Sequence, residues 1–188
     1  MDEIQKTFTI QWVGPFHSLA EMNKYFQQGK QEIMSDPSVF SFYYFNGNKR
    51  GKGYKITNFY DYFGINKTFN VKSRLNTQHE HYTQFLENRN MEIWVGAFAN
   101  PKDQTPHNIE DVETILISTY KPTENVLKKN RLLDTSMCII NLWYKPNETP
   151  WKRKPESVKH INDVLICEVG ANIQRFLVGT LKEIKTQK

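Results

Sequence analysis

The sequence has few cysteines and lacks the pattern of a zinc site. Only two of its 188 residues are cysteine, Cys138 and Cys167, and no paired clusters of Cys and His accompany them. Each cysteine lies in an apolar run that is typical of a strand. We expect two buried free thiols in a reducing compartment, with a disulfide between neighbouring strands as the less favoured alternative.

The sequence also lacks a long apolar run, an N-terminal signal core, an internal repeat and a low-complexity segment. No run approaches the roughly 20 apolar residues that a membrane-spanning helix needs. The first ten residues, MDEIQKTFTI, are acidic near their start and carry no apolar core of a secretory signal. These absences indicate a soluble, cytoplasmic protein without a membrane partner.

The sequence does contain enough apolar material for one ordinary core. Hydrophobic residues make up 38% of the chain and aromatic residues 13%, which argues against disorder. A length of 188 residues suits one domain, or one compact core with extensions. The formal net charge of +5 weakly favours an anionic partner, because basic surfaces attract phosphate backbones regardless of sequence.

Apolar periodicity and capping signals predict mixed secondary structure. Ser18 and Glu21 form a capping box, which predicts a helix over 18–32. Further helices are expected over 71–86 and 109–120. Strands are expected over 7–13, 39–45, 56–63, 91–98, 136–143, 163–169 and 173–184, with an antiparallel pairing of the second and third and a hairpin at 170–172.

One carboxylate on the helix expected over 109–120 is hard to explain by packing. Asn108 should cap this helix, and Ile109, Val112 and Leu116 lie on its apolar face. Glu113 falls within or at the margin of that face. An inward carboxylate costs several kcal/mol unless it has a partner, a bound cation or a raised pKa. We therefore expect Glu113 either to pair with an Arg or Lys of a neighbouring element or to bind a metal ion.

The helix expected over 71–86 carries a polar stripe beside its apolar face. Arg74, Gln78 and His81 lie on this stripe, four and three positions apart. The planar guanidinium of an arginine suits phosphate oxygens. Arg74 is thus a candidate phosphate ligand, and an ordinary surface position is the alternative for both Arg74 and His81.

Tyrosines are dense in the middle of the chain. Five fall within the segment 43–62: Tyr43, Tyr44, Tyr54, Tyr60 and Tyr62. Aromatic residues on strands usually serve packing. Phenols on adjacent strands can also face a common cleft, where they position or deprotonate a water molecule.

Taken in order, these residues resemble the GIY-YIG nuclease domain. The matching features are the tripeptides Phe42-Tyr43-Tyr44 and Tyr62-Phe63-Gly64, then Thr68, Arg74, Glu113, and Asn125 after a Lys-Pro pair. The first tripeptide departs from Gly-Ile-Tyr at its first two positions, and the second keeps its outer two residues. The resemblance covers roughly residues 38–130, about half of the chain.

The resemblance implies a fold. It would be an α/β sandwich whose small central antiparallel sheet of three strands is flanked by helices. Residues 38–130 would form this catalytic core. Residues 1–37 would be an N-terminal extension of one strand and one helix, and residues 131–188 a mainly β C-terminal extension packed on the core.

The resemblance also implies an activity, the metal-dependent hydrolysis of phosphodiester bonds in double-stranded DNA. Glu113 would hold one Mg²⁺ or Mn²⁺ ion, and Arg74 would contact the scissile phosphate. Tyr44 and Tyr62 would line the site, one of them orienting or activating the attacking water. Asn125 would help to place the phosphate or order its own loop.

Two further residues of the expected site stay open. Some members of the family carry a His one turn after the Arg, whereas this chain has Gln78 there and His81 one turn further on. His81 is therefore a candidate whose role the resemblance leaves in doubt. Lys55, near the strand expected over 56–63, is a weaker candidate.

The size and layout of the chain suit a restriction-type endonuclease, in which additions around the core read the DNA sequence. A catalytically inactive domain that binds nucleic acid or a protein is the main alternative, favoured by the altered first tripeptide and by Gln78. A third class is a small-molecule enzyme or interaction protein in which Glu113 forms an internal salt bridge. The oligomeric state stays open, a homo-oligomer included.

Overall fold

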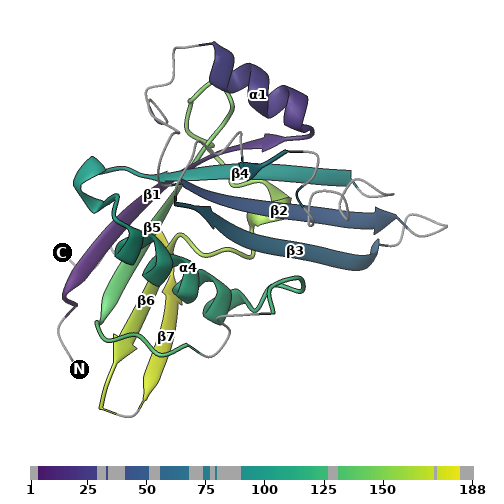
Figure 1. The fold of residues 1–188 in the computed structure, drawn as a ribbon. Coiled ribbons are helices and arrows are strands. Elements are labelled where there is room, and N and C mark those ends of the chain that lie inside the picture. Colours follow the sequence, from purple (N-terminus) through teal and green to yellow (C-terminus); the bar gives the residue numbers. More distant parts are fainter. Residues whose placement is uncertain are drawn as a thin grey trace.

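Figure 1 shows the fold as a computed structural model, which describes residues 4–28, 33, 41–50, 56–67, 74–76, 79, 90–126, 131–171 and 173–182. Its strands form one sheet in the order β3-β2-β4-β1-β5-β6-β7. Their bounds are β1 Lys6–Phe16, β2 Ser41–Arg50, β3 Ile56–Asn66, β4 Asn90–Phe98, β5 Met137–Tyr144, β6 Val164–Val169 and β7 Gln174–Gly179. The sheet is strongly curled, as shown by the steep angle between β2, β3 and β4 at one end and β6 and β7 at the other (Figure 1).

The sheet mixes parallel and antiparallel pairing. β1 is parallel to β5, and all the other neighbouring strands are antiparallel. β1 therefore lies inside the sheet and joins the β3-β2-β4 end to the β5-β6-β7 end. Paired residues form a continuous line across five neighbouring strands. In order from β5 to β3 they are Tyr144, Val13, Val95, Tyr43 and Gly64.

The two faces of the sheet carry different hydrophobic clusters. One cluster contains residues of helix α1 (Leu19–Gln27) together with Val13, Tyr43 and Val95. The other contains residues of helix α4 (Pro106–Tyr120) together with Trp12, Phe42 and Phe63 of the opposite face. Two single-turn 3₁₀ helices complete the described elements: η1 Pro101–Asp103 and η2 Glu156–Val158.

The fold class expected from the sequence is wrong. The antiparallel strands β3, β2 and β4 are adjacent, as expected, but they are one end of a seven-stranded sheet and not a complete central sheet. Strand β1 pairs with the free edge of β4, and β5 then pairs with β1. An edge strand has unpaired backbone groups that another strand can satisfy. The segments expected to pack on a core as extensions therefore continue its sheet, and the described part is mostly β with α1 and α4 as its α-helices.

The expected cap of α1 at Ser18 is confirmed, whereas the return hydrogen bond of the capping box comes from the residue before the cap. The Ser18 hydroxyl accepts a hydrogen bond from the Glu21 amide at 3.1 Å, and the Glu21 carboxylate accepts one from the His17 amide at 2.7 Å. The expected start of α4 is wrong. The helix begins at Pro106 with Thr105 as its cap, because proline needs no hydrogen-bond partner in a first turn.

Both cysteines are free, as expected. They lie on the paired strands β5 and β6, where Cys167 is opposite Met137 and Cys138 is opposite Ile166. Residues directly opposite each other share a face, so the two thiols point to different sides of the sheet and cannot form a disulfide. Burial raises the pKa of Cys167 to about 11.

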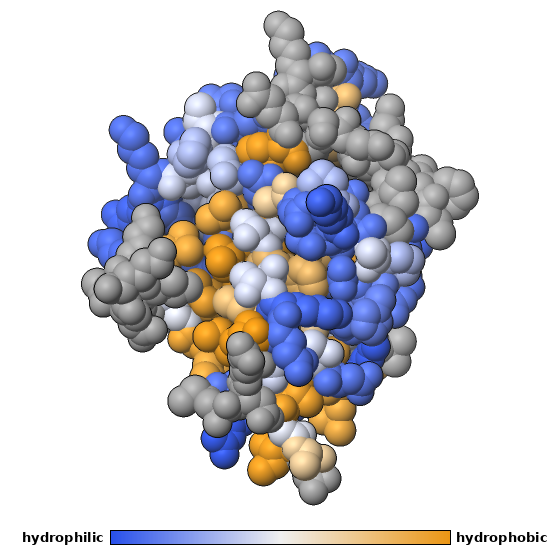
Figure 2. Space-filling view, turned by 90° about the vertical axis from the view of Figure 1, so that its left-hand side faces the viewer, coloured by the Kyte–Doolittle hydropathy of each residue, from blue (hydrophilic) through white to orange (hydrophobic). Residues whose placement is uncertain are grey.

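Large apolar side chains are exposed at the β7 edge of the sheet. The exposed ones among the described residues are Val126, Leu132, Ile173, Leu177 and Val178, of which the last two lie on β7. Figure 2 shows apolar side chains also reaching the surface on another side of the molecule, between hydrophilic groups. No helix within the described ranges is long and apolar enough to cross a membrane.

Candidate active site

Adjacent tyrosines on β2 face opposite sides of the sheet. Side chains alternate along a strand, so Tyr43 and Tyr44 point in opposite directions. The pairing of β2 with β3 sets Tyr43 opposite Gly64, and Tyr44 opposite Phe63. Tyr43 therefore shares the α1 face with Tyr62, whereas Tyr44 and Phe63 belong to the cluster under α4.

Four side chains meet on the α1 face and are called here the tyrosine–arginine site: Tyr43, Tyr62, Arg74 and His79. The Tyr43 hydroxyl lies 3.1 Å from Nε2 of His79. The Tyr62 ring packs against the Tyr43 ring with centroids 6.0 Å apart, and the Arg74 guanidinium is near enough to the Tyr43 phenol to act on its charge. Tyr43 is fully buried, Tyr62 is half-buried and Arg74 is exposed, so this group leads from the interior to the solvent.

The Tyr43 phenol stays protonated at neutral pH. Burial is the largest cause that raises its pKa above the ordinary value of 10.0, and the neighbouring Tyr62 raises it further. The Arg74 guanidinium acts in the opposite direction but does not offset these effects. Tyr43 is therefore suited to donating a hydrogen bond and is not suited to removing a proton from water.

Gly64 makes room for Tyr43. A Cβ atom on Gly64 would lie 2.3 Å from Cζ of Tyr43 and 2.5 Å from its hydroxyl oxygen. These separations are far below van der Waals contact, so only glycine allows the Tyr43 ring to lie across β3. The glycine of the tripeptide Tyr62-Phe63-Gly64 thus has a direct steric reason in this chain.

Tyr44 lies in a separate polar group under the other face. Its hydroxyl is 3.2 Å from Nε2 of His160 and 3.5 Å from Oδ2 of Asp61. Burial, and after it the Asp61 carboxylate, raise the pKa of Tyr44 well above its ordinary value. Desolvation lowers the pKa of His160; Lys154 lowers it further and Asp61 opposes the change. The structure therefore does not bring Tyr44 and Tyr62 together.

Residues after α4 form hydrogen bonds with the edge strand β3. The Asn125 side chain accepts a hydrogen bond from the Phe63 amide at 2.9 Å and donates one to the Phe63 carbonyl at 2.8 Å. The Thr123 amide donates to the Asp61 carboxylate at 2.9 Å. Asn125 is 6% exposed. Its amide thus orders the loop that follows the helix by satisfying the outer backbone groups of β3.

Glu113 is buried on α4, with 8% of its surface exposed. The helix packs against β2 and β3. Glu110, one turn earlier, pairs with Lys67 and with Arg131. Because α4 covers the sheet face opposite the tyrosine–arginine site, the structure does not bring Glu113 together with Tyr62 and Arg74.

The donor set fits only one kind of metal site. Within the described ranges, no group of three or more His, Cys, Asp and Glu side chains is arranged to hold a metal ion. A Mg²⁺ ion, however, usually keeps several water ligands and needs only one or two carboxylates together with substrate phosphates. Glu113 fits that chemistry as a single oxygen ligand, so a metal here would be completed by water and substrate.

Two residues of the tyrosine–arginine site are missed by sequence analysis, Tyr43 and His79. Tyr43 could have been found by pairing the two expected strands, because a tyrosine opposite Gly64 lies on the same face as that glycine and can extend over it. His79 lies five positions after Arg74, and no periodic pattern singles it out. His81, Lys55, Thr68 and most of the segment 71–86 lie outside the described residues.

Comparisons with known proteins returned no relative of this chain. No family model matches it, and neither curated proteins nor solved structures include a match.

Proposed function

We propose that this protein is a metal-dependent DNA endonuclease of restriction type. The observation that carries the proposal is the convergence of Arg74 and His79 on the Tyr43 hydroxyl beside Tyr62. Phosphodiester hydrolysis needs positive charge near the phosphoryl oxygens and an oriented water. The exposed Arg74 guanidinium supplies the positive charge, and the neighbouring phenols can orient the water. The net positive charge of the chain suits double-stranded DNA as the partner.

Each side chain has a defined task in this proposal. Arg74, which is exposed, contacts the scissile phosphate through its planar fork. Tyr43 is held protonated and orients its neighbours, and Tyr62, which is half-buried, presents its phenol to the attacking water. Glu113 would hold a Mg²⁺ or Mn²⁺ ion on the α4 face, across the sheet from Arg74, so the ion and Arg74 would reach one phosphate only after a rearrangement of this region on DNA binding. Asn125 keeps β3, and with it Tyr62, in place.

The experiment compares cleavage of varied duplex DNA by wild type, Glu113→Ala and Glu110→Ala in Mg²⁺ or Mn²⁺. Wild type should cut DNA, and chelation by EDTA should stop cutting. Glu113→Ala should abolish cutting and retain DNA binding. Glu110→Ala removes a surface carboxylate of the same helix and should still cut. Equal behaviour of wild type and Glu113→Ala on every substrate would contradict the endonuclease.

One observation favours a second candidate, a domain that binds DNA without cutting it. Tyr43 has no exposed surface, so it cannot touch a substrate directly in this arrangement. Retained DNA binding without cleavage, for wild type and Glu113→Ala alike, would support this candidate. We propose a reducing compartment such as the cytoplasm for either function, because both cysteines are free.

A further inference from the structure

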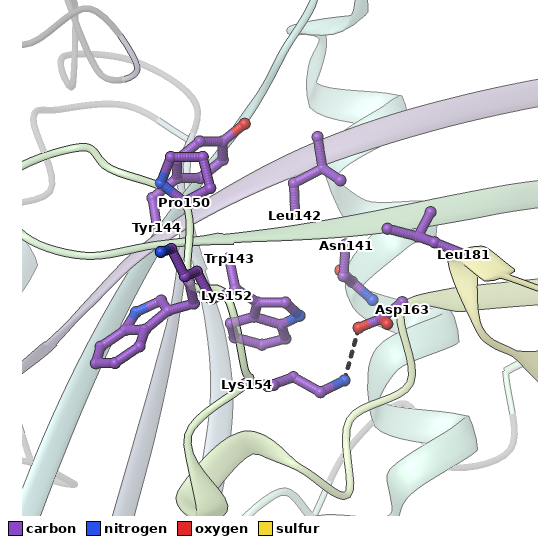
Figure 3. A pocket seen from close by; sticks show the side chains of 10 residues that line it. Asn141, Leu142, Trp143, Tyr144, Pro150, Lys152, Lys154, Asp163 and Leu181 are labelled. Carbon is purple, nitrogen blue, oxygen red and sulfur yellow. Dashed lines mark hydrogen bonds and ion pairs between the residues drawn. The ribbon is translucent and has the colours of Figure 1, made fainter.

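A pocket of ≈ 270 Å³ lies beside the C-terminal half of β5 (Figure 3). The strand pairing of β6 with β5 reaches only Ile140, so residues 141–144 extend past their partner strand. The basic segment 151–154 passes there and forms part of the wall. In the sheet, β1 and β4 separate β5 from β2, so this pocket is distinct from the tyrosine–arginine site.

Aromatic rings held in fixed orientations line the pocket. Trp143 stacks on Trp12 with ring centroids 5.7 Å apart and an interplanar angle of 14°. Trp151 donates its indole N–H to the Gly14 carbonyl at 3.1 Å. The Lys145 ammonium lies 5.2 Å from the centre of the Trp151 ring. The Lys154 ammonium likewise lies 5.6 Å from the centre of the Trp143 ring. These contacts hold both rings in place before any ligand binds, which reduces the entropy lost on binding, and a stacking ligand would take the place of a lysine over a ring.

The pocket wall also holds a buried donor without a partner. Trp143 is 8% exposed, and its Nε1–H has no hydrogen-bond partner within the described part of the chain. Buried donors are nearly always satisfied in folded proteins. Figure 3 shows the nitrogen end of this indole on the same side of the pocket as the Asp163 carboxylate. A ligand with an acceptor atom could satisfy Trp143.

Asp163 supplies an acceptor next to that donor. Its Oδ1 atom accepts a hydrogen bond from the Lys154 ammonium at 2.7 Å (Figure 3). A carboxylate has about four lone-pair positions, so the group can accept further hydrogen bonds. The pocket therefore offers the Trp143 indole and the Lys154 ammonium as donors, the Asp163 carboxylate as an acceptor, and aromatic walls.

Basic residues lie on the segment that passes the pocket. Lys152 lines the pocket, and the neighbouring Arg153 is exposed. Exposed lysine and arginine attract the phosphates of a nucleic acid. A ligand that is both flat and linked to phosphate matches this combination of charge and aromatic surface.

We propose that this pocket receives one unpaired nucleobase of DNA, and that it selects a base whose Watson–Crick edge carries an amino group beside a ring-nitrogen acceptor, namely cytosine or adenine. The amino group donates to Asp163, and the ring nitrogen accepts from Trp143. Enzymes that bind extruded bases use the same combination of stacking and contacts to the Watson–Crick edge. Thymine presents a carbonyl where these two bases present the amino group, so Asp163 disfavours it. DNA as the source of the base rests on the proposed function.

The test measures binding of dCMP, dAMP, dTMP and 2-deoxyribose 5-phosphate to the full chain by isothermal titration calorimetry. The two favoured nucleotides should bind about tenfold or more tightly than the sugar phosphate, since one stacked base contributes that much or more. They should also bind several-fold more tightly than dTMP. Equal binding of all four compounds, or no saturable binding of dCMP and dAMP, overturns the proposal.

Variants separate the pocket from the fold. Leu181→Trp fills the pocket from its wall and should weaken dCMP binding at least about tenfold, in line with loss of stacking. Lys159→Ala, an exposed residue paired with Glu156 outside the pocket, should leave binding unchanged. Asp163→Asn should reduce the preference for dCMP over dTMP, a ratio that a mere loss of stability does not change. An unchanged ratio overturns the role of Asp163.

Failure of this inference differs from failure of the proposed function. Cleavage of DNA by a wild-type protein that binds the sugar phosphate as well as dCMP overturns the base pocket and keeps the endonuclease. Selective dCMP or dAMP binding by a protein that never cuts DNA keeps the pocket and overturns the endonuclease.

Discussion

The two faces of the β2–β3 pair show how one residue step along a strand changes the chemistry of a tyrosine. Tyr43 meets Arg74 and His79 on the α1 face, whereas Tyr44 meets Asp61 and His160 on the α4 face. Both phenols are buried and both have raised pKa values. Only the Tyr43 face combines the phenol with an exposed guanidinium and a second tyrosine, so the partners and not the burial distinguish the candidate site.

A substitution at Gly64 is expected to have the largest effect on the α1 face. We expect Gly64→Ala to lower the free energy of unfolding by about 3 kcal/mol, the upper range for overpacking, because the new Cβ would overlap the buried Tyr43 ring. Cleavage should fall as well, since Tyr43 must move away from Arg74. Urea denaturation and a cleavage assay measure the two effects.

Gly170→Ala is the matched control for this prediction. A Cβ at Gly170 would have its nearest contact at 3.5 Å, an ordinary van der Waals separation. Its free energy of unfolding should therefore change much less than that of Gly64→Ala. Similar losses for both variants would mean that the loss at Gly64 does not come from the space that the Tyr43 ring occupies.

Removing one hydroxyl at a time compares the two tyrosines directly. Tyr43→Phe should lower the rate of DNA cleavage by about 100-fold, the scale for a small misplacement of catalytic groups, because Tyr43 positions its neighbours and does not touch the substrate. Tyr44→Phe should leave the rate nearly unchanged and lower the free energy of unfolding by about 1–2 kcal/mol, because Asp61 and His160 lose a partner. A larger loss of cleavage in Tyr44→Phe than in Tyr43→Phe would indicate that the active site lies on the α4 face.

The smallest expected effect is a pH dependence of stability on the α4 face. His160 has a lowered pKa in the folded state, mainly through desolvation, so the unfolded chain binds its proton more readily. Stability should be highest above the ordinary pKa of 6.5 and should fall as the pH falls from there toward the folded-state pKa. Lys154 strengthens this trend and Asp61 weakens it.

Urea denaturation of wild type and His160→Gln at several pH values measures this effect. The loss of stability below the ordinary histidine pKa should be smaller in His160→Gln, while the difference between the two proteins should be constant at higher pH. Identical pH profiles would show that His160 does not titrate differently in the folded and unfolded states.

Local features of the chain were predictable because their causes are local. The capping box at Ser18 and Glu21 uses neighbouring backbone groups, and the β-branched and aromatic runs predicted strands close to those observed. The start of α4 was misplaced, because Thr105 followed by Pro106 competes with Asn108 as the helix start.

The candidate site was predictable only in part. Arg74 and Tyr62 were identified from their order along the chain, and they lie in one group. The sequence predicted Tyr44 as a site residue, whereas Tyr43 is the one opposite Gly64. A shift of one residue in the strand register exchanges the two faces, so the correct tyrosine could not be chosen without the register. The role of His79 depends on a contact across 36 positions of sequence, which no local pattern records.

Local sequence was enough to place most strands and helices and to put the cysteines in apolar strands, because periodicity, caps and side-chain size act between near neighbours. The tertiary structure alone decided that seven strands share one curled sheet, that Tyr43 rather than Tyr44 meets Arg74, and that Trp143 and Asp163 line one pocket. These outcomes depend on strand order and register, which are set by hydrogen bonding and burial between segments far apart along the chain.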